Sequence, residues 1–178
     1  SRVIPDRKTS QLFLQELKKS HKVSASFGLA VIFYRNDNPF SNPDSASKYI
    51  SLAGNFYKET PTQESYFSFK IDSLEILKLA DSVAMKSFKT IFTSNKTELL
   101  ERFVVINPYA PLHLKQKALG LRDQICYNIN QYHNNSDSTK WLMLKHPEST
   151  LYNELSLLLD QQIFEKQKKK KKPEDYIE

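Results

Sequence analysis

The side chains that could perform metal or nucleophilic chemistry are scattered along this sequence. The histidines are His21, His113, His133 and His146. No two of them lie four residues apart, and no second cysteine or acidic cluster completes a metal-ligand set. We therefore expect solvated histidines. Cys126 follows an isoleucine within a helical pattern, which is typical of a small core residue rather than a nucleophile.

Acid–base and phosphate chemistry are equally poorly supported. Glu98 and Glu101 lie three residues apart, as two solvated acids on one helix would, and no pattern predicts a pocket around them. No serine occupies a Gly-x-Ser-x-Gly nucleophile elbow. Glycine occurs only at Gly28, Gly54 and Gly120, so no Gly-rich phosphate loop is present. The sequence predicts a protein that is not an enzyme and holds no metal or cofactor.

The strongest local feature is a run of six lysines: Lys166, Lys168, Lys169, Lys170, Lys171 and Lys172. Their charges equal the formal net charge of +6, so the rest of the chain is formally neutral. Clustered cations bind anionic lipid or nucleic acid, and we expect weak binding of such polyanions here. Residues 165–178 are expected to form a disordered tail, and the alternative to polyanion binding is that this tail is only solubilising.

Helical periodicity dominates the remaining sequence and predicts an all-α bundle of seven to nine helices. Thr9 or Ser10 is expected to cap the first helix. Asp72, with Glu75 three residues later, resembles a capping box at the start of another helix. Further helices are expected over about 45–58, 98–106, 111–132 and 147–164. Residues 1–110 form one bundle, and residues 111–164 add packed helices to the same domain.

The central element is expected at residues 27–35, an apolar block without a charge in its interior. Its Val, Ile, Phe and Tyr residues favour a strand, and a buried strand remains an alternative. We prefer a helix over 24–35, because Phe27, Ala30, Val31 and Tyr34 recur at helical spacing. At most, a small strand pair could form near residues 27–34 and 66–71.

Two segments near the end of the chain are expected to be irregular. Residues 133–139 are polar and predict a mobile loop. Trp141 follows in a short apolar piece, where it could anchor an interface. A core or connector role is the more common fate of such a residue. Pro147 is expected in the first turn of the last helix.

The order of these elements resembles the homology domain of regulators of G-protein signalling (RGS), over residues 12–110. The similarity is carried by Leu12, Phe13, Leu17, Phe27, Leu29, Ala30, Tyr34, Arg35, Ala53, Phe56, Tyr57, Ile71, Asp72, Phe88, Ile91, Phe92, Arg102, Phe103 and Tyr109. The resemblance implies an all-helical bundle that binds a protein partner.

Two departures from the RGS pattern concern function. Gly28 stands where that family has a tryptophan. In the family, the loop before Phe27 carries acidic residues and an asparagine that contact the G protein, but here it includes Lys22, Val23 and Ser24. The resemblance thus implies partner binding at these three residues without GTPase acceleration.

These observations favour a non-catalytic helical protein-interaction module, of a signalling or scaffold type, with Trp141 as a second contact point. A nucleic-acid-associated subunit of a larger complex, with winged-helix subdomains, is one alternative. A peripheral membrane adaptor acting through the lysine tail is another. Cys126 is the only cysteine and cannot form an internal disulfide, so a cytoplasmic or nuclear protein that is not secreted is expected.

Overall fold

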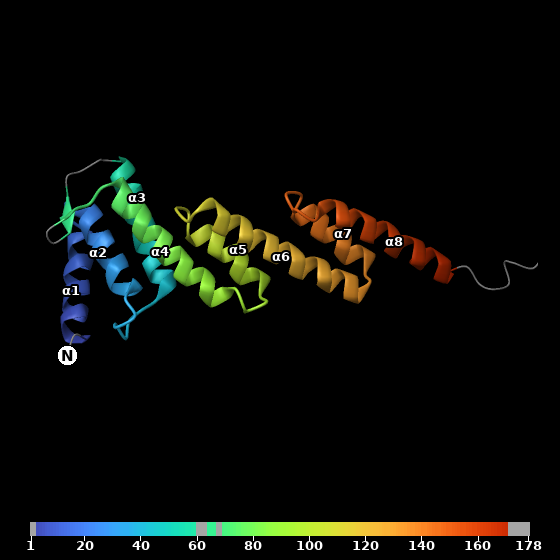
Figure 1. The fold of residues 1–178 in the computed structure, drawn as a ribbon, viewed down its shortest axis with the longest axis horizontal. Helices are drawn as coiled ribbons and strands as arrows, with labels where there is room; N and C mark the ends of the chain where they lie inside the picture. Colours follow the sequence, from blue (N-terminus) through green and yellow to red (C-terminus); the bar gives the residue numbers. More distant parts are fainter. Residues whose placement is uncertain (1–2, 60–63, 67–68, 171–178) are drawn as a thin grey trace, which may run out of the picture. The chain divides into compact units, whose positions relative to one another are not determined.

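A computed structural model describes residues 3–59, 64–66 and 69–170 of the chain (Figure 1). The helices in this part are α1 (Val3–Glu16), α2 (Lys22–Tyr34), α3 (Pro43–Glu59), α4 (Ser73–Ile91), α5 (Thr97–Ile106), α6 (Leu112–His133), α7 (Ser136–Lys145) and α8 (Tyr152–Lys170). Two short strands, β1 (Ser65–Tyr66) and β2 (Phe69–Lys70), lie between α3 and α4. The predicted all-α class is therefore confirmed.

The chain divides into two compact units, Ser1–Ala118 and Leu119–Glu178. The division falls inside α6, whereas the sequence suggested that residues 111–164 share one domain with residues 1–110. Residues 119–170 therefore form a small unit of their own from the second half of α6, α7 and α8. We call the two parts unit 1 and unit 2.

Helix α2 is the central element of unit 1, as expected for residues 27–35. It packs against α1, α3 and α4, which surround it with apolar side chains. Its residues are apolar on nearly every side, and a helix of that kind is stable only when buried. Phe27, Leu29 and Ala30 are at most 4% exposed. The helical interpretation is confirmed, and the alternative strand at residues 27–34 is wrong.

The core of unit 1 forms where α2, α3 and α4 meet. Its buried members are Val23, Phe27, Ala30, Ile50, Ala53, Ile71, Ile76 and Ala80. Asp72 caps α4 as predicted, because its side chain accepts a 2.9 Å hydrogen bond from the backbone N–H of Glu75. The carboxylate of Glu75 accepts a 2.7 Å bond from Lys78 Nζ, one turn along the same helix.

The first helix begins earlier than its sequence suggested. Helix α1 starts at Val3, so Thr9 and Ser10 lie in its interior and cap nothing. The hydroxyl of Ser10 instead donates a 2.9 Å bond back to the carbonyl of Arg7. Pro5 lies in the first turn of α1, where proline is tolerated because the backbone N–H that it lacks would have no intrahelical partner.

The expected connector at residues 66–71 contains the strand pair. Strands β1 and β2 pair antiparallel, with Ser65 opposite Lys70 and Tyr66 opposite Phe69. They pair with each other and not with residues 27–34, which belong to α2. After them, the backbone N–H of Ile71 donates a 2.9 Å bond to the carbonyl of Glu64, which closes the hairpin over α2.

Unit 2 differs most from expectation. The predicted loop at 133–139 is largely helix, because α7 starts at Ser136. Asn134 adopts a positive φ of 48° and makes the turn, and asparagine tolerates that region better than most residues. Asn135 then caps α7 by accepting bonds from the backbone N–H groups of Asp137 and Ser138.

The last helix starts later and runs further than predicted. Helix α8 begins at Tyr152, so Pro147 lies in the preceding turn and not in the helix. It continues to Lys170, which corrects the expectation of disorder for residues 165–170. The rest of the predicted disordered tail, residues 171–178, lies outside the described part of the chain.

Candidate functional site

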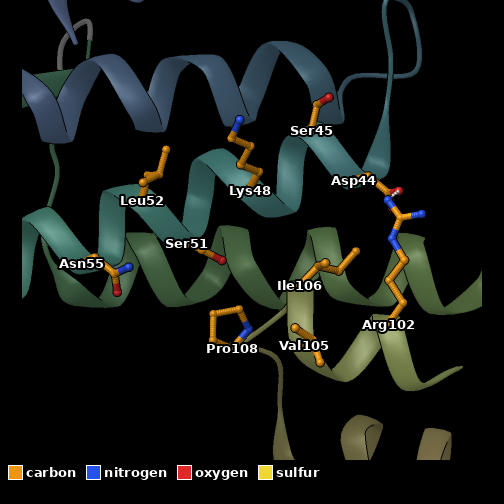
Figure 2. Close-up of a pocket in the computed structure, with 10 residues that line it drawn as sticks. All are labelled: Asp44, Ser45, Lys48, Ser51, Leu52, Asn55, Arg102, Val105, Ile106 and Pro108. Carbon is orange, nitrogen blue, oxygen red and sulfur yellow. Dashed lines mark hydrogen bonds and ion pairs between the residues drawn. The ribbon is translucent and has the colours of Figure 1, made fainter. Parts of the chain in front are cut away.

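Unit 1 contains an open groove of about 440 Å³ between α3 and α5 (Figure 2). It is lined by Asp44, Ser45, Lys48, Ser51, Leu52, Asn55, Arg102, Val105, Ile106 and Pro108. The α3 residues recur at three and four positions, so they share one side of that helix. The adjacent side of α3 carries the buried residues Ala46, Ile50 and Ala53. The groove is thus the solvent-facing margin of a helix anchored in the core.

An ion pair closes one end of the groove. Arg102 Nη2 on α5 lies 2.6 Å from Asp44 Oδ2 in the first turn of α3, as Figure 2 shows. Their side chains are 59% and 49% exposed, so the pair contributes at most about 1 kcal/mol to stability. Asp44 also benefits from the positive end of the α3 dipole. The pair therefore fixes the two side chains at this end of the groove and contributes little to the stability of the fold.

Tyr109 adjoins the groove through its neighbours Asn55 and Pro108, which line it. Its hydroxyl group donates a 2.9 Å bond to Asn55 Oδ1, and Lys58 Nζ lies 4.7 Å from the centre of its ring. A Cβ atom at Gly54 would lie 2.7 Å from this ring, so glycine is needed for the close approach. Gly54 is one of only three glycines in the sequence, but no pattern in the sequence predicts that Tyr109 packs against it.

Buried polar bonds join the two walls beneath the groove. The hydroxyl of Ser47 on α3 donates a 2.6 Å bond to Asn107 Oδ1, directly after α5. Asn107 Nδ2 in turn donates a 2.9 Å bond to the carbonyl of Phe103. Ser47 is fully buried and Asn107 is 4% exposed. Satisfied polar networks of this kind fix one arrangement of a core, so the walls are held in register.

The middle of the groove is apolar and open. Val105 on α5 is 77% exposed, and it lines the groove with Leu52, Ile106 and Pro108. The charged side chains of the lining are two cations, Lys48 and Arg102, and one carboxylate, Asp44. The groove can therefore accept apolar side chains, with a small excess of positive charge beside them.

The residues that the sequence suggested for partner binding at the start of α2 lie in a different setting. Val23 is 2% exposed and belongs to the core, so its predicted role as a contact is wrong. Ser24 donates from its backbone N–H and its hydroxyl to Glu64 Oε2, at 2.8 and 2.6 Å. Lys22 is exposed, with its Nζ 5.4 Å from the Phe56 ring centre. The three residues therefore do not form one contact surface.

Trp141 lies on α7 in unit 2 and is 59% exposed, so a core role is wrong for it. Lys145 Nζ lies 5.1 Å from its ring centre, one turn along the helix. The lysine run begins on α8, where Lys166 Nζ lies 3.7 Å from Asp137 Oδ2. Lys168 and Lys169 are exposed on the same helix, whereas Lys171 and Lys172 lie outside the described residues.

The histidines meet the expectation of solvent exposure with one exception. His21, His113 and His133 are exposed, but His146 is only 8% exposed. It follows the end of α7, where its Nδ1 lies 3.4 Å from Glu148 Oε1. Within residues 3–59, 64–66 and 69–170, no three His, Cys, Asp or Glu side chains are placed to hold a metal ion.

Glu148 belongs to the one dense charge cluster in the described part of unit 2. Its Oε1 also accepts a 3.2 Å bond from Arg122 Nη2 on α6. A bond from its own backbone N–H, followed by the Arg122 guanidinium, holds the pKa of Glu148 below its usual value against the opposing effect of burial. Arg122 is 3% exposed, and its direct bonds tie it to the loop before α8. The cluster stabilises the fold and contains no nucleophile or open position.

Comparisons with known proteins gave no family assignment: no family model matched the chain, and no similar curated protein or solved structure was found. None of the described helices combines the length and apolar character that a membrane span requires.

Proposed function

We propose that this chain is a non-catalytic helical interaction module, and that its α3–α5 groove binds a short apolar segment of a partner protein. The observation that carries the proposal is the 77% exposure of Val105 inside a concave, apolar surface. A single exposed valine needs no explanation on a convex surface. Beside Leu52 and Pro108 in a groove, it is available to a partner side chain.

Charge complementarity defines the chemistry of that partner segment. Arg102 is engaged by Asp44 at 2.6 Å, which leaves Lys48 as the cation in excess on the rim. A carboxylate next to the apolar residues of the segment would be attracted to Lys48. Such rim charges act more on specificity and association rate than on affinity. We therefore propose an acidic–apolar segment as the occupant.

The rigidity of the walls also supports binding at this place. The Ser47–Asn107 bond and the Gly54–Tyr109 contact hold α3 against the end of α5 before any partner arrives. A preformed site loses less conformational entropy on binding than a site that must be ordered. The signalling or scaffold context suggested by the sequence remains part of the proposal.

The proposal excludes GTPase acceleration, although the resemblance to RGS domains remains a prediction. That activity needs polar side chains presented to the G protein by the loop before Phe27. Here Val23 is buried, and Ser24 is bonded to the carboxylate of Glu64. The arrangement supports a module that binds a partner without that activity.

The two alternative functions, nucleic-acid association and membrane association, have different support. The winged-helix version of the nucleic-acid hypothesis needed a strand at residues 27–34, and those residues belong to α2. The winged-helix version therefore has no strand at these residues to support it. The peripheral-membrane hypothesis is favoured by a separate surface on α7 and α8.

A selection from a phage-displayed library of random peptides tests the groove directly, because it requires no identified partner. The target variants are Val105→Asp, which places a carboxylate in the groove, and Leu74→Asp, which makes the same change at a 57% exposed position on α4. We expect enriched peptides that combine Leu, Ile or Phe with Asp or Glu. Val105→Asp should abolish their capture, and Leu74→Asp should leave it unchanged.

A further inference from the structure

We infer that a surface formed by α7 and the end of α8 in unit 2 docks onto a bilayer that contains anionic phospholipid. In this arrangement Lys140, Lys166 and Lys169 contact lipid phosphates, while Trp141, Leu144 and Ile163 enter the interfacial layer. The inference does not depend on the α3–α5 groove, which belongs to unit 1.

Two hollows gather the cations of this surface. One, of about 310 Å³, is lined by Ser136, Asp137, Lys140, Leu159, Ile163, Lys166 and Gln167. The other, of about 360 Å³, is lined by His133, Asn134, Asn135, Ser136, Gln162, Glu165, Lys166 and Lys169. Ser136 and Lys166 line both hollows, so the two are adjacent. Lysines from α7 and α8 therefore meet around the start of α7.

Large apolar side chains adjoin these lysines. Leu144 lies one turn beyond Lys140 on α7 and is 74% exposed, and Trp141 lies three residues before Leu144. Thr139 and Leu142, on the other side of α7, are buried, so this apolar pair faces away from the core of unit 2. Ile163 on α8 is 41% exposed and lines the same hollow as Lys140. Ile163 thus shares a hollow with Lys140 and Lys166, and Trp141 and Leu144 extend the exposed side of α7 beside Lys140.

The helical extension of α8 places the lysines in fixed positions. Leu155, Leu158 and Gln162 form the buried side of α8, and Lys166 and Lys169 continue that side at the next helical spacings. Beyond Gln162 the core of unit 2 ends, so lysines replace the apolar residues at its margin. Cations held by a helix lose less entropy on binding than cations on a disordered tail.

The balance of charge favours an anionic partner. The charged residues that line the two hollows are three lysines, Lys140, Lys166 and Lys169, and two carboxylates, Asp137 and Glu165. Asp137 is 85% exposed and only loosely paired with Lys166 at 3.7 Å. Glu165 accepts a 2.7 Å bond from Asn134 Nδ2, which turns it toward the α6–α7 turn. The surface therefore retains an excess of positive charge.

The apolar members distinguish a bilayer from a nucleic acid. Nucleic-acid bases stack on aromatic rings, and the rings of this surface are Trp141 and the smaller imidazole of His133. Leu144 and Ile163 are aliphatic and gain most from contact with acyl chains. Tryptophan prefers the membrane interface, and lysine extends its amine to the headgroups while its stem remains in apolar surroundings. A bilayer offers phosphates to the lysines and an interfacial layer to these apolar side chains.

Trp141 provides a direct readout, because it is the only tryptophan of the sequence. We would titrate the full chain with phosphatidylcholine vesicles, with and without about one-third phosphatidylserine, at low and high salt. We expect a blue shift of tryptophan emission and co-sedimentation with the anionic vesicles, both weakened by salt. Each lysine near an anionic surface contributes about fivefold to partitioning, so Lys140→Glu/Lys166→Glu should reduce it at least about tenfold.

The matched control is Lys8→Glu/Lys18→Glu, which makes the same change in net charge at exposed positions of unit 1. It should lower partitioning no more than about twofold. Leu144→Ser should reduce the blue shift while leaving the salt dependence intact. Circular dichroism of each variant establishes that the helices persist.

Three results would overturn the inference. The first is the absence of a blue shift with anionic vesicles. The second is partitioning that Lys140→Glu/Lys166→Glu leaves intact but that deletion of residues 171–178 abolishes, because a tail alone would then explain it. The third is binding of a single-stranded oligonucleotide with quenching of Trp141 and no vesicle binding, which would assign the surface to nucleic acid.

Discussion

The carboxylate of Asp123 on α6 holds the turn that leads into α8, because its Oδ2 accepts a 3.0 Å bond from the backbone N–H of Thr150. Its other oxygen accepts 2.8 and 2.6 Å bonds from Arg122 Nε and Nη2. Both side chains are less than 5% exposed. Burial alone would lower the pKa of Arg122, but the hydrogen bonds and charges of Asp123 and Glu148 together outweigh that effect and raise the pKa. This pair organises the core of unit 2.

Asp123→Asn should therefore destabilise unit 2 strongly. The change leaves the Arg122 charge buried without its main partner, and the loss of one member of such a pair costs about 3 kcal/mol. Urea unfolding followed by the fluorescence of Trp141, which lies in unit 2, measures the change. The control Asp160→Asn alters an exposed carboxylate of α8 and should shift the midpoint little. Equal midpoints for both variants would show that the pair is not required.

Two glycines should respond to alanine in opposite directions. At Gly54 the new methyl group would lie 2.7 Å from the Tyr109 ring, and overpacking costs about 1–3 kcal/mol, offset by about 1 kcal/mol of helix propensity. We expect a net loss of stability and a displaced tyrosine. At Gly120, inside α6, nothing lies within 4 Å of the added atom.

Gly120→Ala should therefore increase stability by about 0.5–1 kcal/mol, the usual gain for an unobstructed helical site. Thermal unfolding of both variants beside the original chain gives the comparison. If Gly54→Ala stabilised the protein as much as Gly120→Ala, the close contact between Gly54 and the Tyr109 ring would be wrong.

Glu148 should make the stability of unit 2 sensitive to acid. Its pKa is lowered in the folded state, so its contribution is present above the unfolded pKa of about 4.3 and is lost as pH falls through the folded value. The side chain is 56% exposed, so the effect should stay below about 1 kcal/mol. Unfolding midpoints measured from pH 6 to pH 3 test this.

At pH 6, Glu148→Gln should be less stable than the original chain. Toward pH 3, the difference in stability between the two should become smaller. Glu154→Gln removes another exposed carboxylate near the start of α8 and serves as the control. If the difference in stability between Glu148→Gln and the original chain stayed constant from pH 6 to pH 3, the role given to the Glu148 carboxylate would be contradicted.

Unit 1 was largely predictable because its helices are apolar on the side that they bury. Residues 27–35 were expected to be central, and α2 is. Asp72 was expected to cap a helix, and it does. The groove could not be predicted, because it depends on which sides of α3 and α5 meet. No spacing within either helix carries that information.

Unit 2 was mispredicted for a specific physical reason. Leu114, Ala118 and Ile129 recur at helical spacing along α6, a pattern that is typical of a single apolar face. Leu114 and Ala118 are buried in unit 1, but Ile129 is 49% exposed. Within unit 2, α6 instead buries a polar side that carries Arg122, Asp123 and Asn130. Hydrophobic periodicity cannot indicate a core face whose groups are satisfied by hydrogen bonds.

A second polar cluster had the same consequence for the predicted loop. Thr139 was expected at the end of a mobile loop, yet it is fully buried, and its hydroxyl donates a 2.8 Å bond to Gln162 Oε1 on α8. Gln162 Nε2 donates a 3.1 Å bond to the carbonyl of Asn130 on α6. These bonds join α6, α7 and α8, and they involve residue types that usually indicate a loop.

The most direct test of the account is the affinity of a groove-binding peptide. An acidic–apolar peptide obtained from the library selection would be labelled and titrated with the original chain, Val105→Asp and Leu74→Asp. The account predicts that Val105→Asp weakens binding at least about tenfold, a loss of about 1.4 kcal/mol, while Leu74→Asp binds like the original. Equal affinities for all three chains, with their helices intact, would contradict the assignment of the α3–α5 groove as the interaction site.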